Sequence, residues 1–259
     1  MRIKQSICYP LFKPEQVSLE TLFAAAAEIG YRAVELWARP DNFAEIVATA
    51  RRHDLVMASM IGHQSLPDGL NKRTNHDRIE AEIRASIDIA VEYEVPGLIC
   101  FSGNRQPYQS ESEAMAAVAD GLRRVAPYAE EKGINLNLEL LNSKINHPGY
   151  QADHTAWAAA VCQRVNSPRV KMLYDIYHMQ IMEGDIIRTI RDHIDWIGHF
   201  HTAGNPGRND LDDLQELNYP GICRAIAETG YELYVGHEFK PKGDWLASLK
   251  QTFACCDQG

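Results

Sequence analysis

The sequence predicts an α/β protein built as a single (β/α)8 barrel. The first observation is that short β-branched runs alternate with longer helical stretches eight times along 259 residues. The second is a glycine directly after several predicted helices, at Gly30, Gly133 and Gly230, which is typical of left-handed helix caps. The third is length, because eight such units in about 250 residues match the size of this barrel.

Each predicted unit begins with an apolar strand and continues into an amphipathic helix. The strands are predicted at 4–8, 33–37, 55–61, 97–101, 134–139, 170–175, 196–201 and 232–238. The helices are predicted at 18–29, 42–53, 74–94, 111–132, 153–165, 184–193, 219–229 and 244–256. A doubly wound open sheet is the alternative, but it usually carries a glycine-rich phosphate loop after an early strand, which this sequence lacks. We therefore expect one domain over 1–259.

Composition and charge argue against several classes of function. The formal net charge is −9, which is unfavourable for neutralising nucleic-acid phosphates, so no nucleic-acid partner is expected. No apolar run approaches the roughly 18 residues of a membrane span, and the first residues do not resemble a signal peptide. The six cysteines show no CxxC spacing. We expect a reduced, cytoplasmic protein that does not associate with membranes.

Polar residues recur at the carboxyl ends of the last four predicted strands. Because successive side chains of a strand point to opposite faces, Glu139 faces the inside of the barrel when its apolar neighbours face the helices. The same count places Asp175, His201 and Glu238 inward at the ends of the next three strands. Neighbouring strands lie about 4.8 Å apart, so these side chains can reach one point at the face where such barrels hold their active sites.

These four residues form a hard ligand set in which oxygen predominates. A single carboxylate at a strand end is often only a helix cap or the partner of an arginine. Four consecutive strand ends are different, because without a cation three carboxylates would crowd a partly desolvated cup. The set predicts one divalent cation, Mg²⁺, Mn²⁺ or Co²⁺, rather than a metal selected by thiolates.

Four motifs in this order resemble the xylose-isomerase-like barrel superfamily, and within it the hydroxypyruvate isomerase and ketose 3-epimerase branch. The motifs are ELLNSK (139–144), YDIYHMQ (174–180), HFHTAGNPGR (199–208) and GHEF (236–239). The resemblance extends over nearly the whole chain. Members of the family often form homodimers or homotetramers, so either assembly is expected here.

The resemblance also implies roles for individual residues. The positions matching Glu139, Asp175, His201 and Glu238 coordinate the metal in that family, and the two glutamates form the acid/base pair on opposite faces of the substrate. The position matching His178 contacts substrate oxygens. The position matching Arg208 is an arginine that grips the far end of the substrate.

Two departures leave the reaction open. Typical hydroxypyruvate isomerases carry Gln at the position of His201, whereas the 3-epimerases carry His, and Asn205-Pro206 differs from the isomerases' VPGR-type loop. We expect an isomerase that moves a proton through an enediolate of a small hydroxy-carbonyl substrate, with hydroxypyruvate to tartronate semialdehyde favoured. A ketose 3-epimerase, or a lyase or decarboxylase with the same chemistry, is the alternative. Two alternatives come from other classes of protein. One is a non-catalytic sugar-binding barrel, and the other is an abasic-site endonuclease, which needs more metal ligands and a basic groove.

Further residues of the same rim are predicted to contact substrate, although ordinary packing or rim polarity explains each of them about as well. They are Trp37, His63, Asn142 and Lys144. Glu35 and His199 also face inward. Glu35 is not predicted to be catalytic, and His199 is predicted to be buried for structural reasons rather than to bind a metal.

Overall fold

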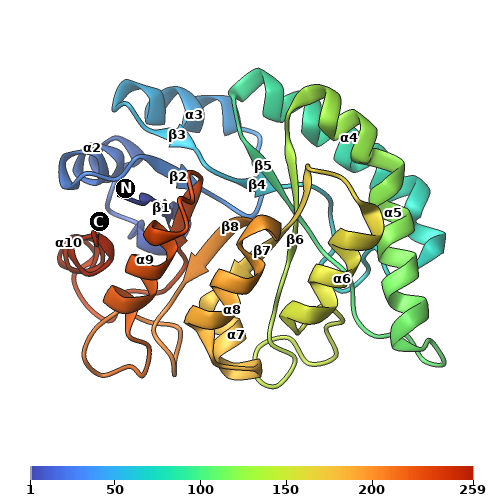
Figure 1. Cartoon of the computed structure of the whole chain (residues 1–259). Helices are drawn as coiled ribbons and strands as arrows, with labels where there is room; N and C mark the ends of the chain where they lie inside the picture. The colour runs from blue at the N-terminus through green and yellow to red at the C-terminus, as the bar shows by residue number, and fades with distance from the viewer. Residues whose placement is uncertain (1, 259) are drawn as a thin grey trace.

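Parallel strands form the centre of the molecule, and helices surround them (Figure 1). The structure is a computed structural model that describes residues 2–258. The strands are β1 Lys4–Cys8, β2 Ala33–Glu35, β3 Val56–Met57, β4 Met60–Ile61, β5 Gly97–Cys100, β6 Asn135–Glu139, β7 Val170–Asp175, β8 Ile197–Thr202 and β9 Tyr234–His237. They pair in the order β3-β2-β1-β9-β8-β7-β6-β5-β4, and each pairing is parallel. The predicted α/β barrel is confirmed.

The third predicted strand differs from the other seven. It is split into β3 and β4, with Ala58 and Ser59 between them. β3 pairs with β2, and β4 pairs with β5, so this one segment joins the two ends of the sheet and completes the ring. Just beyond β4, the Gly62 N–H donates to the Ile99 carbonyl at 2.8 Å, so the pairing with β5 continues past the strand.

The main helices begin and end within two residues of their predicted positions. They are α2 Leu19–Ile29, α3 Phe43–Arg52, α4 His76–Tyr93, α5 Glu111–Lys132, α6 Thr155–Val165, α8 Ile186–His193, α9 Tyr219–Glu228 and α10 Trp245–Cys256. In α5, the Ser110 and Glu113 side chains form a capping box, and Gly133 ends the helix with φ of 74°. Gly30 and Gly230 also have positive φ, as their place after helices predicted.

Two short helices were not predicted, α1 Tyr9–Phe12 and α7 Ile176–Met182. The second of these matters for the site, because β7 runs directly into it. The Asp175 carboxylate accepts a hydrogen bond from the His178 main-chain N–H at 2.9 Å, so the last residue of the strand is also the N-cap of the helix.

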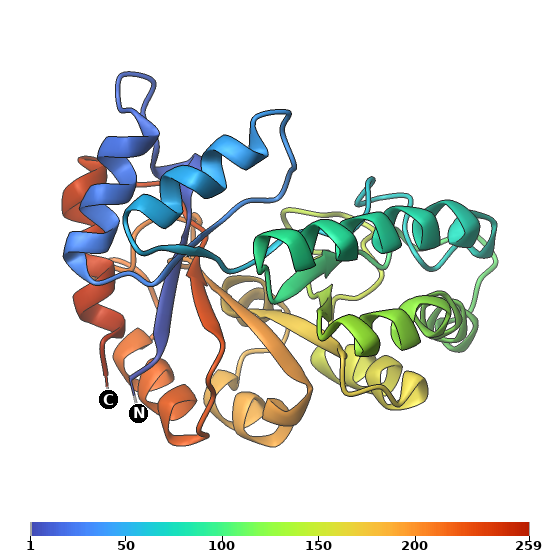
Figure 2. The same cartoon turned by 90° about the horizontal axis from the view of Figure 1, so that it is seen from above.

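The last helix packs against the first long helix, which brings the two chain ends together. α10 contacts α2, and the Tyr31 hydroxyl donates to the Leu249 carbonyl at 3.0 Å. The first and last described segments of the chain lie close together in Figure 1 and in the view from above (Figure 2). Among the described residues, no helix combines the length and the apolar character needed to cross a membrane.

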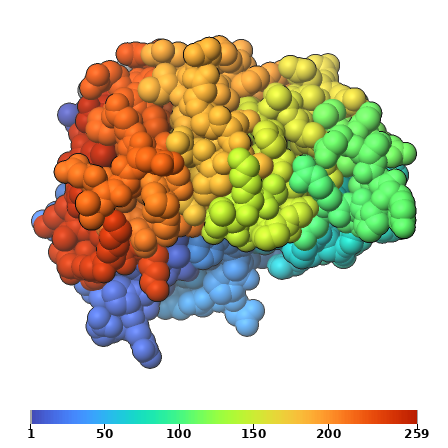
Figure 3. Space-filling view, turned by 90° about the horizontal axis from the view of Figure 1, so that it is seen from below, coloured from blue at the N-terminus to red at the C-terminus, as the bar shows by residue number. Residues whose placement is uncertain are grey.

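The carboxyl ends of the parallel strands share one face of the barrel, at the bottom of Figure 1. Figure 3 views the molecule from this side. Yellow-green atoms of the loop 140–154 after β6 and orange atoms of the loop 203–218 after β8 form much of the surface. Residues at the ends of β6 to β9 therefore lie beneath these loops.

Candidate functional site

The four strand-end residues come together at the carboxyl mouth of the barrel. Glu139 ends β6, Asp175 ends β7, His201 lies in β8, and Glu238 directly follows β9. One potential ligand atom from each residue lies within 4.8 Å of the corresponding atoms of the other three. All four side chains are buried. The strand alternation thus brings these four side chains together, as expected.

The two ring nitrogens of His201 face different surroundings. Nε2 lies 3.2 Å from the Glu35 carboxylate. Nδ1 lies 3.6 Å from a Glu139 oxygen and 3.3 Å from a Glu238 oxygen, and it is buried without a hydrogen-bond partner among the described residues. A histidine that donates through one nitrogen to a carboxylate and turns the other toward acidic side chains has the arrangement of a metal ligand.

Glu35 is a residue whose contribution the sequence did not reveal. Its buried carboxylate accepts from the Ser6 hydroxyl and from His199 Nε2, each at 2.7 Å, as well as from His201. Burial opposes ionisation, yet attraction by the two histidines holds the pKa of Glu35 below its usual value. A Cβ on Gly236 would overlap the Glu35 carboxylate, so β9 needs glycine at this point.

Glu238 is held by donors from two other parts of the chain. Trp37 Nε1 donates to one carboxylate oxygen at 2.6 Å, and Arg208 Nη2 donates to the other. Burial opposes ionisation, but the charges of His201 and Arg208 keep the pKa of Glu238 below its usual range. Trp37, which is predicted to contact substrate, orients a carboxylate of the cluster in this structure.

Arg208 places a positive charge at the edge of the acidic cluster. Its Nη2 is 4.0 Å from an Asp175 oxygen, and its guanidinium lies over the Tyr177 ring, 5.7 Å from the ring centroid. Although burial opposes this, the carboxylates of Glu238 and Asp175 raise the pKa of Arg208. Its Nε is buried without a hydrogen-bond partner among the described residues, so one donor of the guanidinium is unused.

The other two carboxylates resist ionisation. Burial, with the negative charge of Glu238 as the next cause, raises the pKa of Asp175 to about 7. Burial also raises the pKa of Glu139. Three buried carboxylates that repel one another are stabilised by a cation, so the electrostatics of this cup favour binding of positive charge.

His178 and Asn142 lie beside Asp175. His178 is fully buried in α7, with Nε2 3.7 Å from an Asp175 oxygen and without a hydrogen-bond partner among the described residues. Its Nδ1 contacts the Asn142 amide nitrogen at 2.5 Å. The ring therefore presents one free nitrogen toward the cluster. The helix that carries His178, α7, was not predicted. The local sequence signal for its start is Asp175, which lies three residues before His178 and caps the helix.

His63 and Lys144 are engaged by main-chain atoms. His63 is buried, its Nδ1 lies 3.1 Å from its neighbour's carbonyl, and its Nε2 accepts from the Phe101 N–H at 2.9 Å. Lys144 Nζ donates to the carbonyls of Ile181 at 2.9 Å and Met182 at 3.1 Å, at the end of α7. These bonds explain both side chains structurally, and their predicted contacts with substrate stay predictions.

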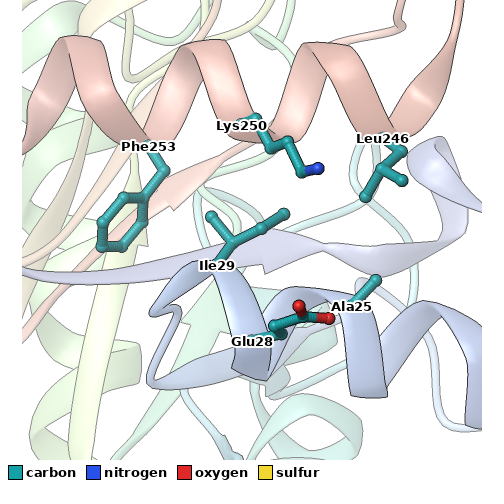
Figure 4. A pocket seen from close by; sticks show the side chains of 6 residues that line it. All are labelled: Ala25, Glu28, Ile29, Leu246, Lys250 and Phe253. Carbon is teal, nitrogen blue, oxygen red and sulfur yellow. The ribbon is translucent and has the colours of Figure 1, made fainter.

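A hollow on the outside of the barrel lies apart from the cluster. It has a volume of about 340 Å³ between α2 and α10 (Figure 4). Its lining consists of Ala25, Glu28, Ile29, Leu246, Lys250 and Phe253. Since this lining includes only one acid and one base from the outer helix layer, the acidic cluster at the barrel mouth is the stronger candidate for a functional site.

Comparison with known proteins agrees with the motifs and the geometry. Residues 23–255 match the family model described as "Xylose isomerase-like TIM barrel". A Danio rerio protein named "Putative hydroxypyruvate isomerase" is 32% identical over 239 residues, which are 87% of this chain and 86% of that protein. A "2-oxo-tetronate isomerase" from Cupriavidus necator is 30% identical over 242 residues, 88% of this chain and 89% of that protein.

A solved structure shares the fold at lower sequence identity. The crystal structure titled "AP endonuclease, family 2" from Brucella melitensis superposes with a TM-score of 0.84 at 24% identity, and covers 96% of this chain and 97% of that one. This likeness shows the fold alone. The two relatives described above are named isomerases, which confirms the expected class of enzyme. The chain belongs to the xylose isomerase-like TIM barrel family.

Proposed function

We propose that this isomerase binds one divalent cation through Glu139, Asp175, His201 and Glu238, and interconverts small hydroxy-carbonyl compounds through an enediolate. Hydroxypyruvate, converted to tartronate semialdehyde, is the favoured substrate. The observation that carries the proposal is the convergence of four buried ligand atoms within 4.8 Å of one another at the ends of four successive strands. The names of the relatives support the isomerase reaction.

The residues present fit a hard cation. Carboxylate oxygens and one imidazole nitrogen suit Mg²⁺, Mn²⁺ or Co²⁺. The unpartnered Nδ1 of His201 supports this fit, because Glu35 receives the N–H of the opposite ring nitrogen, so Nδ1 can give up its proton and offer a lone pair to the ion. When bound, such an ion would supply Lewis-acid stabilisation of the negative charge that develops on the substrate oxygens.

The two glutamates would carry the proton transfer. One carboxylate removes a proton from the hydroxymethyl carbon of hydroxypyruvate, and the released electron pair forms the enediolate. The proton is then returned to the former carbonyl carbon, while the hydroxyl proton moves to the other oxygen, which gives tartronate semialdehyde without net gain or loss of atoms. Glu238 is suited to the role of base, because Trp37 and Arg208 hold its carboxylate in the ionised form.

Two further side chains suit the recognition of an acidic substrate. Arg208 has an unused Nε donor and lies beside the cluster, so it is placed to bind a substrate carboxylate. His178 offers its free Nε2 toward the same space. Both are therefore proposed to bind the substrate rather than the metal.

A ketose 3-epimerase is the second candidate, and His201 is the residue that favours it. Epimerisation uses the same proton removal but returns a proton to the same carbon from the opposite face. Glu139 and Glu238 come from β6 and the end of β9, which lie on either side of β7 and β8 in the sheet order. Such a separation suits an acid and a base on opposite faces of a substrate.

The test is an assay of the protein loaded with Mg²⁺, Mn²⁺ or Co²⁺ against hydroxypyruvate, ketohexoses, pentuloses and their phosphates. We expect turnover of hydroxypyruvate with deuterium from D₂O in the product, and loss of both in Glu238→Gln. Turnover of free ketoses alone would support the epimerase. Product without any solvent deuterium would argue against an enediolate, and binding without turnover would contradict the proposal.

A further inference from the structure

The buried side chain of Asn142 has an amide whose orientation is fixed by its neighbours. Its Oδ1 accepts from the main-chain N–H groups of Ile145 at 3.0 Å and Asn146 at 2.8 Å. Main-chain nitrogens only donate, so the atom that faces them is the oxygen, and the amide cannot be turned over. The amide nitrogen therefore points in the other direction, toward His178.

This orientation determines where His178 carries its proton. Asn142 Nδ2 lies 2.5 Å from His178 Nδ1 and 2.7 Å from the Asn146 side-chain oxygen, so its two hydrogens have two acceptors. An amide NH₂ group is only a donor, and His178 Nδ1 must therefore accept. A neutral imidazole has one N–H, so it is on Nε2.

The Nε2 position is the one that faces the candidate site. It is buried, has no hydrogen-bond partner among the described residues, and lies 3.7 Å from an Asp175 oxygen, beyond hydrogen-bond distance. The backbone of the same residue is fixed as well, because the His178 N–H donates to the other Asp175 oxygen at 2.9 Å. Ring and backbone are thus both held before a substrate arrives.

We infer that Asn142 is a positioning residue that holds His178 in the Nε2–H tautomer, so that His178 donates a hydrogen bond to a substrate oxygen. Asn142 then acts behind His178 instead of touching the substrate. A donor at this point suits an oxygen that bears or gains negative charge, such as a carboxylate or enediolate oxygen. The substrate side of this inference rests on the proposed function, whereas the tautomer is a property of the free protein.

The tautomer is measured directly by ¹H–¹⁵N correlation spectra of protein labelled in its histidines, with Mg²⁺ present, at about pH 8, where an ordinary imidazole is neutral. His178→Gln identifies the His178 signals by their loss. We expect the proton on Nε2 and an unprotonated Nδ1. A proton on Nδ1 of the wild-type protein would overturn the inference, whatever the enzyme assays show.

Asn142→Asp tests the function of this contact. The aspartate keeps an acceptor for Ile145 and Asn146, but it presents a second acceptor to His178 Nδ1. We expect a proton to appear on Nδ1 in the spectra, and kcat/KM for hydroxypyruvate to fall about tenfold or more with unchanged Mg²⁺ affinity. The matched control is Asn218→Asp. Asn218 is an exposed helix cap that accepts from the Gly221 N–H, so its replacement should change neither the protonation of His178 nor kcat/KM.

The outcomes separate the two proposals. An Asn142→Asp protein with a proton on Nδ1 but wild-type kcat/KM would overturn the positioning role. If that variant does not fold, the wild-type spectrum and the kcat/KM of His178→Gln decide, and unchanged turnover in His178→Gln would contradict the inference. A wild-type protein with the expected tautomer but without isomerase activity would refute the proposed function and leave the tautomer standing.

Discussion

Two regions of the barrel are built differently. One is the set of strands that carries the acidic cluster, and the other is the broken strand formed by β3 and β4. β6, β7 and β8 are continuous over five or six residues, whereas β3 and β4 have two residues each. On the continuous strands, side-chain alternation delivers Glu139, Asp175 and His201 to one point. After the broken strand, His63 has its ring nitrogens engaged by main-chain groups. The continuous strands thus bring several polar side chains to one point, whereas the histidine after the interruption is engaged by the main chain.

The largest effect is expected from changing a glutamate of the continuous strands. Glu139→Gln removes a proposed acid/base group and a metal ligand, so kcat/KM for hydroxypyruvate should fall about 10²- to 10⁴-fold. Steady-state assays measure this. The matched change near the broken strand is Glu82→Gln, whose carboxylate accepts from the Gln64 N–H at 2.9 Å, and it should keep nearly full activity. An equal loss of kcat/KM in Glu139→Gln and Glu82→Gln would show that the two regions do not differ in their importance for activity.

The next effect concerns Glu35, which lies behind His201. Glu35→Gln leaves an acceptor for the histidine but removes the charge that orients and polarises it, so Mn²⁺ affinity should fall about 10- to 100-fold. Isothermal titration calorimetry gives the affinity, with the exposed Glu232→Gln as control. Unchanged Mn²⁺ affinity in Glu35→Gln would show that His201 does not depend on this carboxylate.

The third prediction concerns the stability of the region around the broken strand. Burial lowers the pKa of His63 from 6.5 to about 4, so the unfolded chain takes up this proton before the folded protein does. The contribution of neutral His63 to the free energy of unfolding is complete above pH 6.5 and is lost as the pH falls toward about 4. That difference in pKa corresponds to about 3 kcal/mol.

Urea unfolding of the wild-type protein and of His63→Gln between neutral pH and about pH 5 checks this expectation. Other titrating groups, including His237, contribute equally to both proteins. The variant should therefore show a shallower loss of unfolding free energy toward acid. Parallel pH curves would mean that His63 is not held neutral by the fold.

The smallest effect is expected at Lys144. Its ammonium group binds the last carbonyls of α7, so Lys144→Met should lower the free energy of unfolding by about 0.3–1 kcal/mol. If the role is structural, kcat/KM stays close to wild type. A large rise in KM with little change in stability would instead support the predicted contact with substrate.

The difference between continuous and broken strands also explains which residues of the site could be predicted from the sequence. Alternation within INLNLE and VKMLYD was sufficient to place Glu139 and Asp175, because both lie at the ends of uninterrupted strands. The end of α5 followed from Gly133, and the structure shows that the helix begins at a Ser110 capping box. These signals are local, so they are readable without knowledge of the tertiary structure.

Other features depend on contacts between distant parts of the chain. The bond between Glu35 and His201 joins residues 166 positions apart, and no local pattern indicates it. α7 was not predicted because Asp175 is at once a strand end and a helix cap, and the helix has only seven residues. The orientation of the Asn142 amide, with its nitrogen toward His178, likewise depends on how the loop after β6 folds.

The central claim is that the four strand-end residues bind one divalent cation. The most direct measurement is a titration of the protein with Mn²⁺ in which electron paramagnetic resonance reports the free ion. The titration is made with the wild-type protein, with Asp175→Asn and with His63→Gln. We predict one ion per chain for the wild type and for His63→Gln, and a loss of binding in Asp175→Asn. Wild-type binding retained in Asp175→Asn, or no Mn²⁺ bound by the wild-type protein, would contradict the account.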